Sequence, residues 1–263
     1  MTVLGYISRV GKIAAAAAAG FVALAPVARA QQASASEATP ATDLKTIVQK
    51  MTEAQQEVRE QYRSYELTRR YEIFDKDKVK PSTEVTARID YLPPDQKKYA
   101  IEKSTGGMGE RAIRHALDHE MDLTKSPEKI EMTERNYTFS LLGETQMNGH
   151  KCWLLESHPK RDEKDLLNAK VWVDEDSYRV MRIAGHPQKS PSFWVKDIDL
   201  TLEYGEMGGM WMHTATRAVA DVRFTGAYTV VSHDVNIRST PMVAKARPRH
   251  GARNAAALAA VIP

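Results

Sequence analysis

The spacing of hydrophobic positions changes near residue 65. Before that point, apolar side chains recur mostly every three or four residues, which is the period of one face of a helix. These positions are Leu44, Ile47, Val48, Met51, Val58, Tyr62 and Tyr65. They predict one amphipathic helix of about twenty residues, with Thr42 as its N-cap.

Beyond residue 65 the apolar positions recur every second residue, in runs separated by turn-forming residues. The predicted strands are residues 65–75, 82–92, 97–104, 137–143, 149–157, 168–174, 178–185, 193–204, 210–222 and 227–238. Between the third and fourth strands, Ile113, Ala116, Leu117 and Met121 indicate a second helix over residues 106–123. Asn148-Gly149 lies between two apolar runs and predicts a hairpin, because both central positions of the favoured turn need a positive φ.

Alternation also assigns side chains to the two faces of the predicted sheet. Along residues 193–204, Trp194, Ile198, Leu200, Leu202 and Tyr204 form an apolar face. On the last strand, Thr229, Val231, Val235 and Ile237 are expected to share one face. One face of the sheet is therefore expected to be apolar and the other hydrated.

Together these elements predict a mainly β, α+β protein built on an antiparallel meander of about ten strands with two helices. Such a long sheet curls because strands twist, and its apolar side needs the helices as cover. Two helices are too few to fill a wide curved sheet completely. Two outcomes stay open: an apolar pocket between sheet and helices, or a fully packed core.

The N-terminus has the pattern of a secretory signal. Arg9 and Lys12 precede an alanine-rich apolar run, and residues 28–30 form a small-x-small site, so cleavage is expected after Ala30. The alternative is an uncleaved membrane anchor, although the run is short for a membrane span. Residues 31–41 are polar and expected to be a disordered leader, and residues 42–240 a single domain.

Charge and cysteine usage exclude several classes of function. The chain has 37 Lys and Arg against 34 Asp and Glu, and three of the basic residues lie within residues 1–30, so the chain after cleavage is formally neutral. A neutral protein gives no electrostatic reason to expect nucleic-acid binding. Cys152 is the single cysteine, which excludes an intrachain disulfide and a zinc site built from several thiolates.

No catalytic signature stands out, and we expect neither enzymatic activity nor a cofactor. His115 and His119 could share a metal, but Ala116 stands where a metalloprotease helix needs glutamate, and a solvated helix face is the simpler interpretation. His150 and Cys152 are interpreted as packing residues. Residues 174–177 are acidic but lack the glycine and distal glutamate of a calcium loop, so they predict a tight turn.

Several segments together resemble the outer-membrane lipoprotein-sorting family of the LolA type. One is the leading helix after a signal without a lipid-attachment cysteine. The second is the hairpin GE…NGHKCWLL at residues 143–155 with His158-Pro159, and the third is Val171-Trp172-Val173-Asp174 followed by an Arg-containing strand. The similarity is best over residues 135–240. It implies an unclosed β-barrel lidded by two or three helices around an apolar cavity that takes acyl chains in the periplasm.

This resemblance makes a periplasmic carrier of lipid or lipoprotein acyl chains the leading hypothesis, with partner proteins at the inner or outer membrane. The apolar cavity candidates are Met51, Val58, Leu154, Val171, Val173, Met181, Ile198 and Leu200. The alternative is a non-enzymatic envelope sensor or interaction protein with the same fold. Residues 241–263 form a basic, Ala-rich tail, either disordered or able to meet anionic lipid or an acidic partner.

Overall fold

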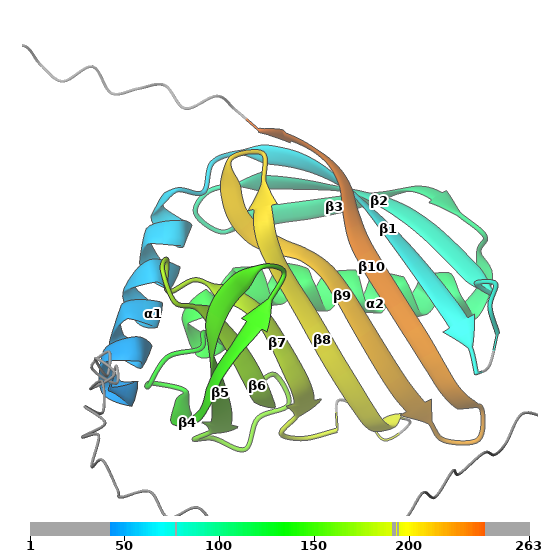
Figure 1. The fold of residues 1–263 in the computed structure, drawn as a ribbon. Coiled ribbons are helices and arrows are strands. Elements are labelled where there is room, and N and C mark those ends of the chain that lie inside the picture. The colour runs from blue at the N-terminus through cyan, green and yellow to red at the C-terminus, as the bar shows by residue number, and fades with distance from the viewer. Residues whose placement is uncertain (1–42, 77, 191–192, 194, 240–263) are drawn as a thin grey trace, which may run out of the picture. The chain divides into compact units, whose positions relative to one another are not determined.

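One ten-stranded antiparallel sheet dominates the computed structural model, which describes residues 43–76, 78–190, 193 and 195–239 (Figure 1). The strands are β1 (Tyr65–Asp75), β2 (Thr83–Leu92), β3 (Gln96–Ser104), β4 (Tyr137–Met147), β5 (His150–Pro159), β6 (Leu167–Asp174), β7 (Val180–Pro187), β8 (Val195–Met207), β9 (Met210–Val222) and β10 (Gly226–Ser239). The sheet is not closed, since β3 and β4 form its two edges. This confirms the predicted fold class.

The strand order is β3-β2-β1-β10-β9-β8-β7-β6-β5-β4, so the sheet consists of two meanders joined between β1 and β10. The junction runs from Tyr65 opposite Ser239 to Asp75 opposite Tyr228. After β3 the chain passes through a helix and a short 3-10 turn (Pro127–Lys129) before β4 begins at the other edge. A simple meander describes each part, and the long-range pairing of β1 with β10 unites them.

Two helices accompany the sheet, α1 (Leu44–Glu60) and α2 (Gly107–Thr124). The predicted first helix ends earlier than its apolar pattern indicated, because Tyr65 begins β1 and alternates there with Leu67. The predicted N-cap Thr42 is wrong by one residue: the helix begins at Leu44, so Asp43 occupies the N-cap of α1, and it makes no side-chain cap hydrogen bond. Among the described residues, neither helix combines the length and apolar character needed to cross a membrane.

The turns follow local backbone chemistry. Asn148 and Gly149 have φ of 52° and 84°, and they join β4 to β5 as the hairpin prediction required. The strand predicted from residue 178 begins two residues later, because Tyr178 has a φ of 56° and belongs to the preceding turn. Asp174 shapes that turn by accepting hydrogen bonds from the backbone N–H and the hydroxyl of Ser177, both at 2.7 Å.

Both helices pack on the same face of the sheet, which we call the inner face. Ile47, Val48 and Met51 of α1 join side chains of β4, β5, β6 and β7 in a buried cluster that we call the α1 cluster. Ile113 and Leu117 of α2 join side chains of β1, β2 and β9 in a second buried cluster, the α2 cluster. Each helix therefore covers a different part of the inner face.

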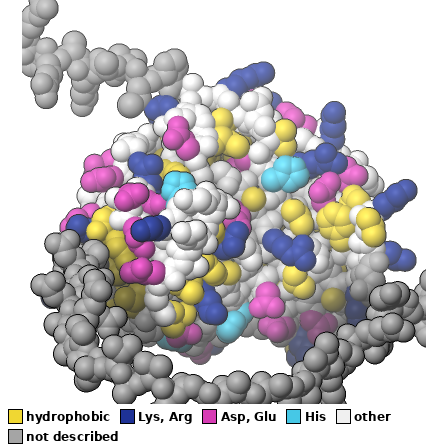
Figure 2. Space-filling model, viewed as in Figure 1, with side chains coloured by type: hydrophobic (Ala, Val, Ile, Leu, Met, Phe, Trp, Pro, Cys, Tyr) yellow, Lys and Arg dark blue, Asp and Glu magenta, His cyan; other side chains and the backbone are white. Residues whose placement is uncertain are grey.

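The opposite, outer face is more polar. Figure 2 shows this side of the molecule, with acidic and basic side chains interspersed among smaller apolar areas. A small cluster of Met147, Cys152 and Met181 lies here, flanked by Trp172 and Trp211. The sheet thus has one mainly apolar and one mainly hydrated face, as alternation predicted.

The predicted shared face of Thr229, Val231, Val235 and Ile237 on β10 is wrong. Thr229 and Val231 lie on the outer face, whereas Ile237 packs against the α2 cluster on the inner face. An irregularity explains the difference, because the register with β1 shifts by one residue at Val235, where Asp234 and Asn236 pair with consecutive β1 residues. Alternation read from sequence fails wherever a bulge inserts a residue.

Some predictions concern residues outside the described part of the chain. These are the signal over residues 1–30, the leader over residues 31–41, the inner-face position of Trp194 and the tail over residues 241–263. They stay predictions.

Candidate functional site

The eight predicted cavity residues occupy different environments. Met51, Val171 and Val173 are buried in the α1 cluster, and Leu200 packs against that cluster. Ile198 lies two residues before Leu200 on β8, and Val58 of α1 is likewise partly buried. The structure therefore places four of these residues in one apolar group on the inner face.

Leu154 and Met181 lie apart from that group. Met181 belongs to the small outer-face cluster. Leu154 pairs with Trp172, whose side chain flanks that same cluster, while its neighbours Trp153 and Leu155 enter the α1 cluster. Residues 152–155 and 180–181 are apolar on both faces, so composition alone does not tell which side chain points inward.

Between the two helix-covered clusters lies a region that we call the inner-face strip. It comprises Ile198, Leu200 and Leu202 on β8, Thr216, Ala218 and Ala220 on β9, and Tyr228, Val230 and Ser232 on β10. The register places them in three rows across the sheet: Leu200, Ala218 and Val230 form the central one. Ala218 and Ala220 of β9 thus lie between larger side chains of β8 and β10, in a strip that extends for roughly 13 Å along the strands.

The strip combines apolar character with incomplete burial. Ile198, Leu200, Leu202, Ala220, Tyr228 and Val230 are each only partly buried, whereas the apolar side chains beneath the helices are almost fully buried. Apolar side chains that remain in contact with water on a concave, helix-flanked face are a place where a hydrocarbon ligand can remove surface from solvent. The strip is therefore the candidate site.

One end of the strip meets a group of charged side chains. Arg69 on β1 is 4% exposed and donates to Asp234 on β10, whose carboxylate is fully buried. Arg69 also pairs with Glu120 of α2 at 2.9 Å, and Lys97 on β3 pairs with the same carboxylate. Two cations and two carboxylates balance each other here, so the group links α2 to the sheet without net charge.

Burial and neighbouring charges shift pKa values in this group. Burial by itself would raise the pKa of Glu120, but Lys97 and Arg69 lower it to about 2. Burial, together with the nearby Arg69, lowers the pKa of His213 on β9 to about 3. The imidazole is therefore neutral at physiological pH, and its Nε2 lies 2.8 Å from the hydroxyl of Thr216 in the strip.

Sequence reasoning missed this charged group, although a signal was present. The inner-face positions of β1 are Tyr65, Leu67, Arg69, Tyr71 and Ile73, and all of them are buried. A single arginine in a series of apolar and aromatic residues indicates a buried charge with a partner. The partners themselves, Asp234 and Glu120, lie far away in the sequence.

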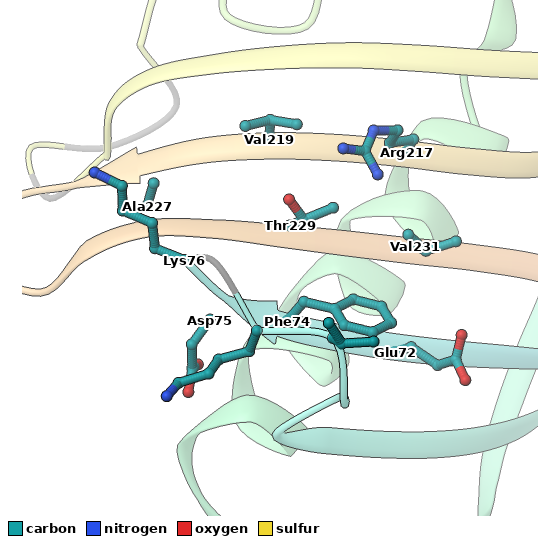
Figure 3. Close-up of a pocket in the computed structure, with 11 residues that line it drawn as sticks. Glu72, Phe74, Asp75, Lys76, Arg217, Val219, Ala227, Thr229 and Val231 are labelled. Carbon is teal, nitrogen blue, oxygen red and sulfur yellow. The ribbon is translucent and has the colours of Figure 1, made fainter. Parts of the chain in front are cut away.

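Two hollows in the described part of the surface lie elsewhere. The first, of about 590 Å³, is on the outer face near the ends of β1, β9 and β10, where Figure 3 shows Phe74, Thr229 and Val231 beside Arg217 and Glu72. The second, of about 760 Å³, runs between the polar side of α1 and residues 128–135. Charged side chains line both, and none of the eight predicted cavity residues does.

Two of the histidines considered for metal binding or packing, His119 and His150, each lie beside a carboxylate. His119 lies 2.9 Å from Asp165, and His150 lies 3.0 Å from Asp174. Within the described ranges, no three His, Cys, Asp or Glu side chains are grouped to hold a metal ion. Burial, followed by Asp174 and Glu175, raises the pKa of Cys152 to about 11, so this buried thiol stays protonated.

A family profile with the description "-like: Uncharacterized protein" matches residues 126–239. A search of curated proteins finds no match.

Solved structures that match include a DUF1329 family protein from Desulfovibrio piger, with 16% identity, a TM-score of 0.39 and coverage of 74% of this chain and 92% of that one. A putative outer membrane lipoprotein-sorting protein domain from Vibrio parahaemolyticus has 13% identity, a TM-score of 0.41 and coverages of 75% and 95%. A LolA superfamily protein from Nitrosomonas europaea has 10% identity, a TM-score of 0.35 and coverages of 74% and 94%. The matching structures thus include a lipoprotein-sorting domain and a LolA superfamily protein, the kind of protein that the sequence resembles.

Proposed function

We propose that the protein is a periplasmic carrier that binds the acyl chains of lipids or lipoproteins on its inner-face strip. The observation that carries this proposal is the partial burial of six apolar side chains between two helices that cover separate clusters. The secretory pattern at the N-terminus supports export. Binding of this kind requires no cofactor and no catalytic residue.

The energetics of acyl binding fit a surface of this composition. Each methylene removed from water contributes about 0.8 kcal/mol, so a sixteen-carbon chain gains on the order of 10 kcal/mol before the costs of association. The chain would lie along β9, over Ala218 and Ala220, between the larger side chains of β8 and β10. The helices would have to move little to admit the acyl chain, because the apolar side of each packs mainly on its own cluster and not on the strip.

Filling the strip tests the proposal. Ala220→Phe places a ring where the acyl chain would lie, and Val219→Phe adds the same ring to the adjacent outer-face position. A fluorescent fatty acid titrated in vesicle-free solution should bind the wild-type protein and Val219→Phe alike, and Ala220→Phe at least about tenfold more weakly. Ala218→Val, a smaller change, should give an intermediate loss.

Circular dichroism melts confirm that each variant remains folded before its affinity is interpreted. Equal affinity of Ala220→Phe and Val219→Phe for the fatty acid would show that the strip is not the acyl-binding site. A wild-type protein that ignores fatty-acyl probes and is repeatedly recovered without lipid would refute the carrier function itself.

A further inference from the structure

The most exposed apolar side chains gather at one end of the molecule. Val79, Phe224, Met108 and Phe193 are 93%, 89%, 76% and 70% exposed, the highest values among large apolar side chains of the described residues. Val79 lies in the β1–β2 turn, Phe224 in the β9–β10 turn and Phe193 just before β8. Four such side chains at one end form a feature that a monomer fully surrounded by water does not explain.

Contacts between these segments show that they belong to one surface. The Arg223 guanidinium lies 5.0 Å from the centre of the Phe193 ring. Val79 and Ala227 line the same hollow, and the end of β1 pairs with the start of β10. Figure 1 shows the β1–β2 turn and the β9–β10 turn at the same side of the sheet.

Met108 extends this surface toward α2. The next residue, Gly109, packs so closely on Thr83 at the start of β2 that an added Cβ would fall 2.1 Å from the threonine hydroxyl. The first turn of α2 therefore sits beside the β1–β2 turn. We call the surface formed by Val79, Met108, Phe193, Arg223 and Phe224 the apolar rim.

Basic side chains surround the rim. Lys76, Lys78 and Lys80 are exposed in the β1–β2 turn, and Arg223 is exposed in the β9–β10 turn. Against these four basic residues stand Asp77 in the β1–β2 turn and Asp75 at the end of β1, which leaves a net charge of +2. The chain after the predicted cleavage is neutral, so this end is more positive than the protein as a whole.

The rim also lies where the inner-face strip ends. The outermost row of the strip is Ile198, Ala220 and Tyr228, and Phe224 follows Ala220 by four residues along the chain. Phe193, just before the neighbouring strand β8, precedes Ile198 by five residues. A hydrocarbon chain that leaves the strip at this end would emerge beside the rim.

We propose that the apolar rim docks the protein on a membrane surface that contains anionic lipid. Exposed Phe, Met and Val side chains can enter the boundary between head groups and acyl chains, while the lysines and Arg223 stay at the level of the phosphates. Anionic head groups attract juxtamembrane basic residues, so binding depends on both the apolar tips and the charge. Docking here would bring one end of the strip to the membrane.

Vesicle flotation tests the docking surface. Protein purified from the periplasmic fraction of an expressing bacterium is mixed with phosphatidylcholine vesicles, with or without phosphatidylglycerol. Wild type should bind the anionic vesicles, and Phe193→Ser/Phe224→Ser should lower the partition coefficient about tenfold or more. Lys76→Gln/Lys78→Gln/Lys80→Gln should remove most of the preference for phosphatidylglycerol.

Leu141→Ser/Leu142→Ser is the matched control, because these two leucines are 40% and 48% exposed on β4, at the edge of the sheet. It should bind vesicles like the wild type. Absence of wild-type binding to anionic vesicles, or equal losses in the rim and control variants, would overturn the proposal.

The docking proposal and the acyl-binding proposal can be refuted independently. Rim variants should keep their affinity for a fatty-acyl probe in vesicle-free solution, since none of the mutated residues belongs to the strip. A rim variant that loses acyl binding but keeps vesicle binding would contradict docking at the rim. Loss of acyl binding in the wild type would instead refute the proposed function and leave the vesicle result to decide the docking surface.

Discussion

His213 should make the stability of the protein depend on pH in the mildly acidic range. The unfolded imidazole takes up a proton near its ordinary pKa of 6.5, whereas the folded one stays neutral down to about 3. The unfolded state therefore binds more protons between these values, and the free energy of unfolding falls as the pH falls. The stabilising contribution is complete only above about pH 6.5.

The size of the effect follows from the shift. One pKa unit corresponds to about 1.36 kcal/mol, so lowering the pH from about 7.5 to about 5 removes up to about 2 kcal/mol. The ring is partly buried, and water screens part of its interaction with Arg69, so we expect a loss of about 1 to 2 kcal/mol. Glu120 adds to the loss only at lower pH, because its pKa changes from 4.5 to about 2.

Urea denaturation at both pH values, on the wild type and on His213→Gln, measures this contribution. Glutamine keeps a polar group near Thr216 but cannot titrate, and the charged residues around position 213, namely Arg69, Lys97, Glu120 and Asp234, are the same in both proteins. The wild type should lose about 1 to 2 kcal/mol more than the variant on acidification. Parallel losses in the two proteins would refute the assignment to His213.

Two further substitutions test the packing described above. Arg69→Met leaves the carboxylate of Asp234 buried without its partner and should cost about 3 to 5 kcal/mol of unfolding free energy. The control Arg70→Met breaks only exposed pairs and should cost less than about 1 kcal/mol. Similar costs for the two variants would contradict a buried ionic group. Gly185→Ala should lower the free energy of unfolding by about 2 to 3 kcal/mol, because the added Cβ would lie 2.0 Å from a backbone oxygen of β6. In Gly205→Ala the nearest atom is 3.7 Å from the added Cβ, so thermal melts should show little change in stability.

Much of the fold could be predicted because its signals are local. Alternation found all ten strands, and the Asn148-Gly149 pair located the hairpin, since a backbone with two positive φ values favours these residues. The helix over residues 106–123 also followed from local periodicity. The pairing of β1 with β10 has no local signature, because its residues are separated by most of the chain.

The candidate site was harder to predict, because strand faces depend on irregularities. The bulge at Val235 reverses the alternation on β10, so Ile237 shares the inner face with Val230 and Tyr228 instead of with Val231. Sequence reasoning included Ile198 and Leu200 but not the small residues of β9. These small side chains indicate a site only when the strand pairing shows that they lie between larger ones on β8 and β10. Packing across strands, and not residue type alone, defines the strip.

Photo-crosslinking with a fatty acid that carries a diazirine on its hydrocarbon chain tests the site most directly. Mass spectrometry of the digested adducts would locate the chain on the protein. We predict modification of the inner-face strip, foremost at Leu200, Ala218 and Tyr228. Adducts confined to the outer-face hollow at Val219 and Thr229, or to the polar side of α1, would contradict an acyl site between the two helices.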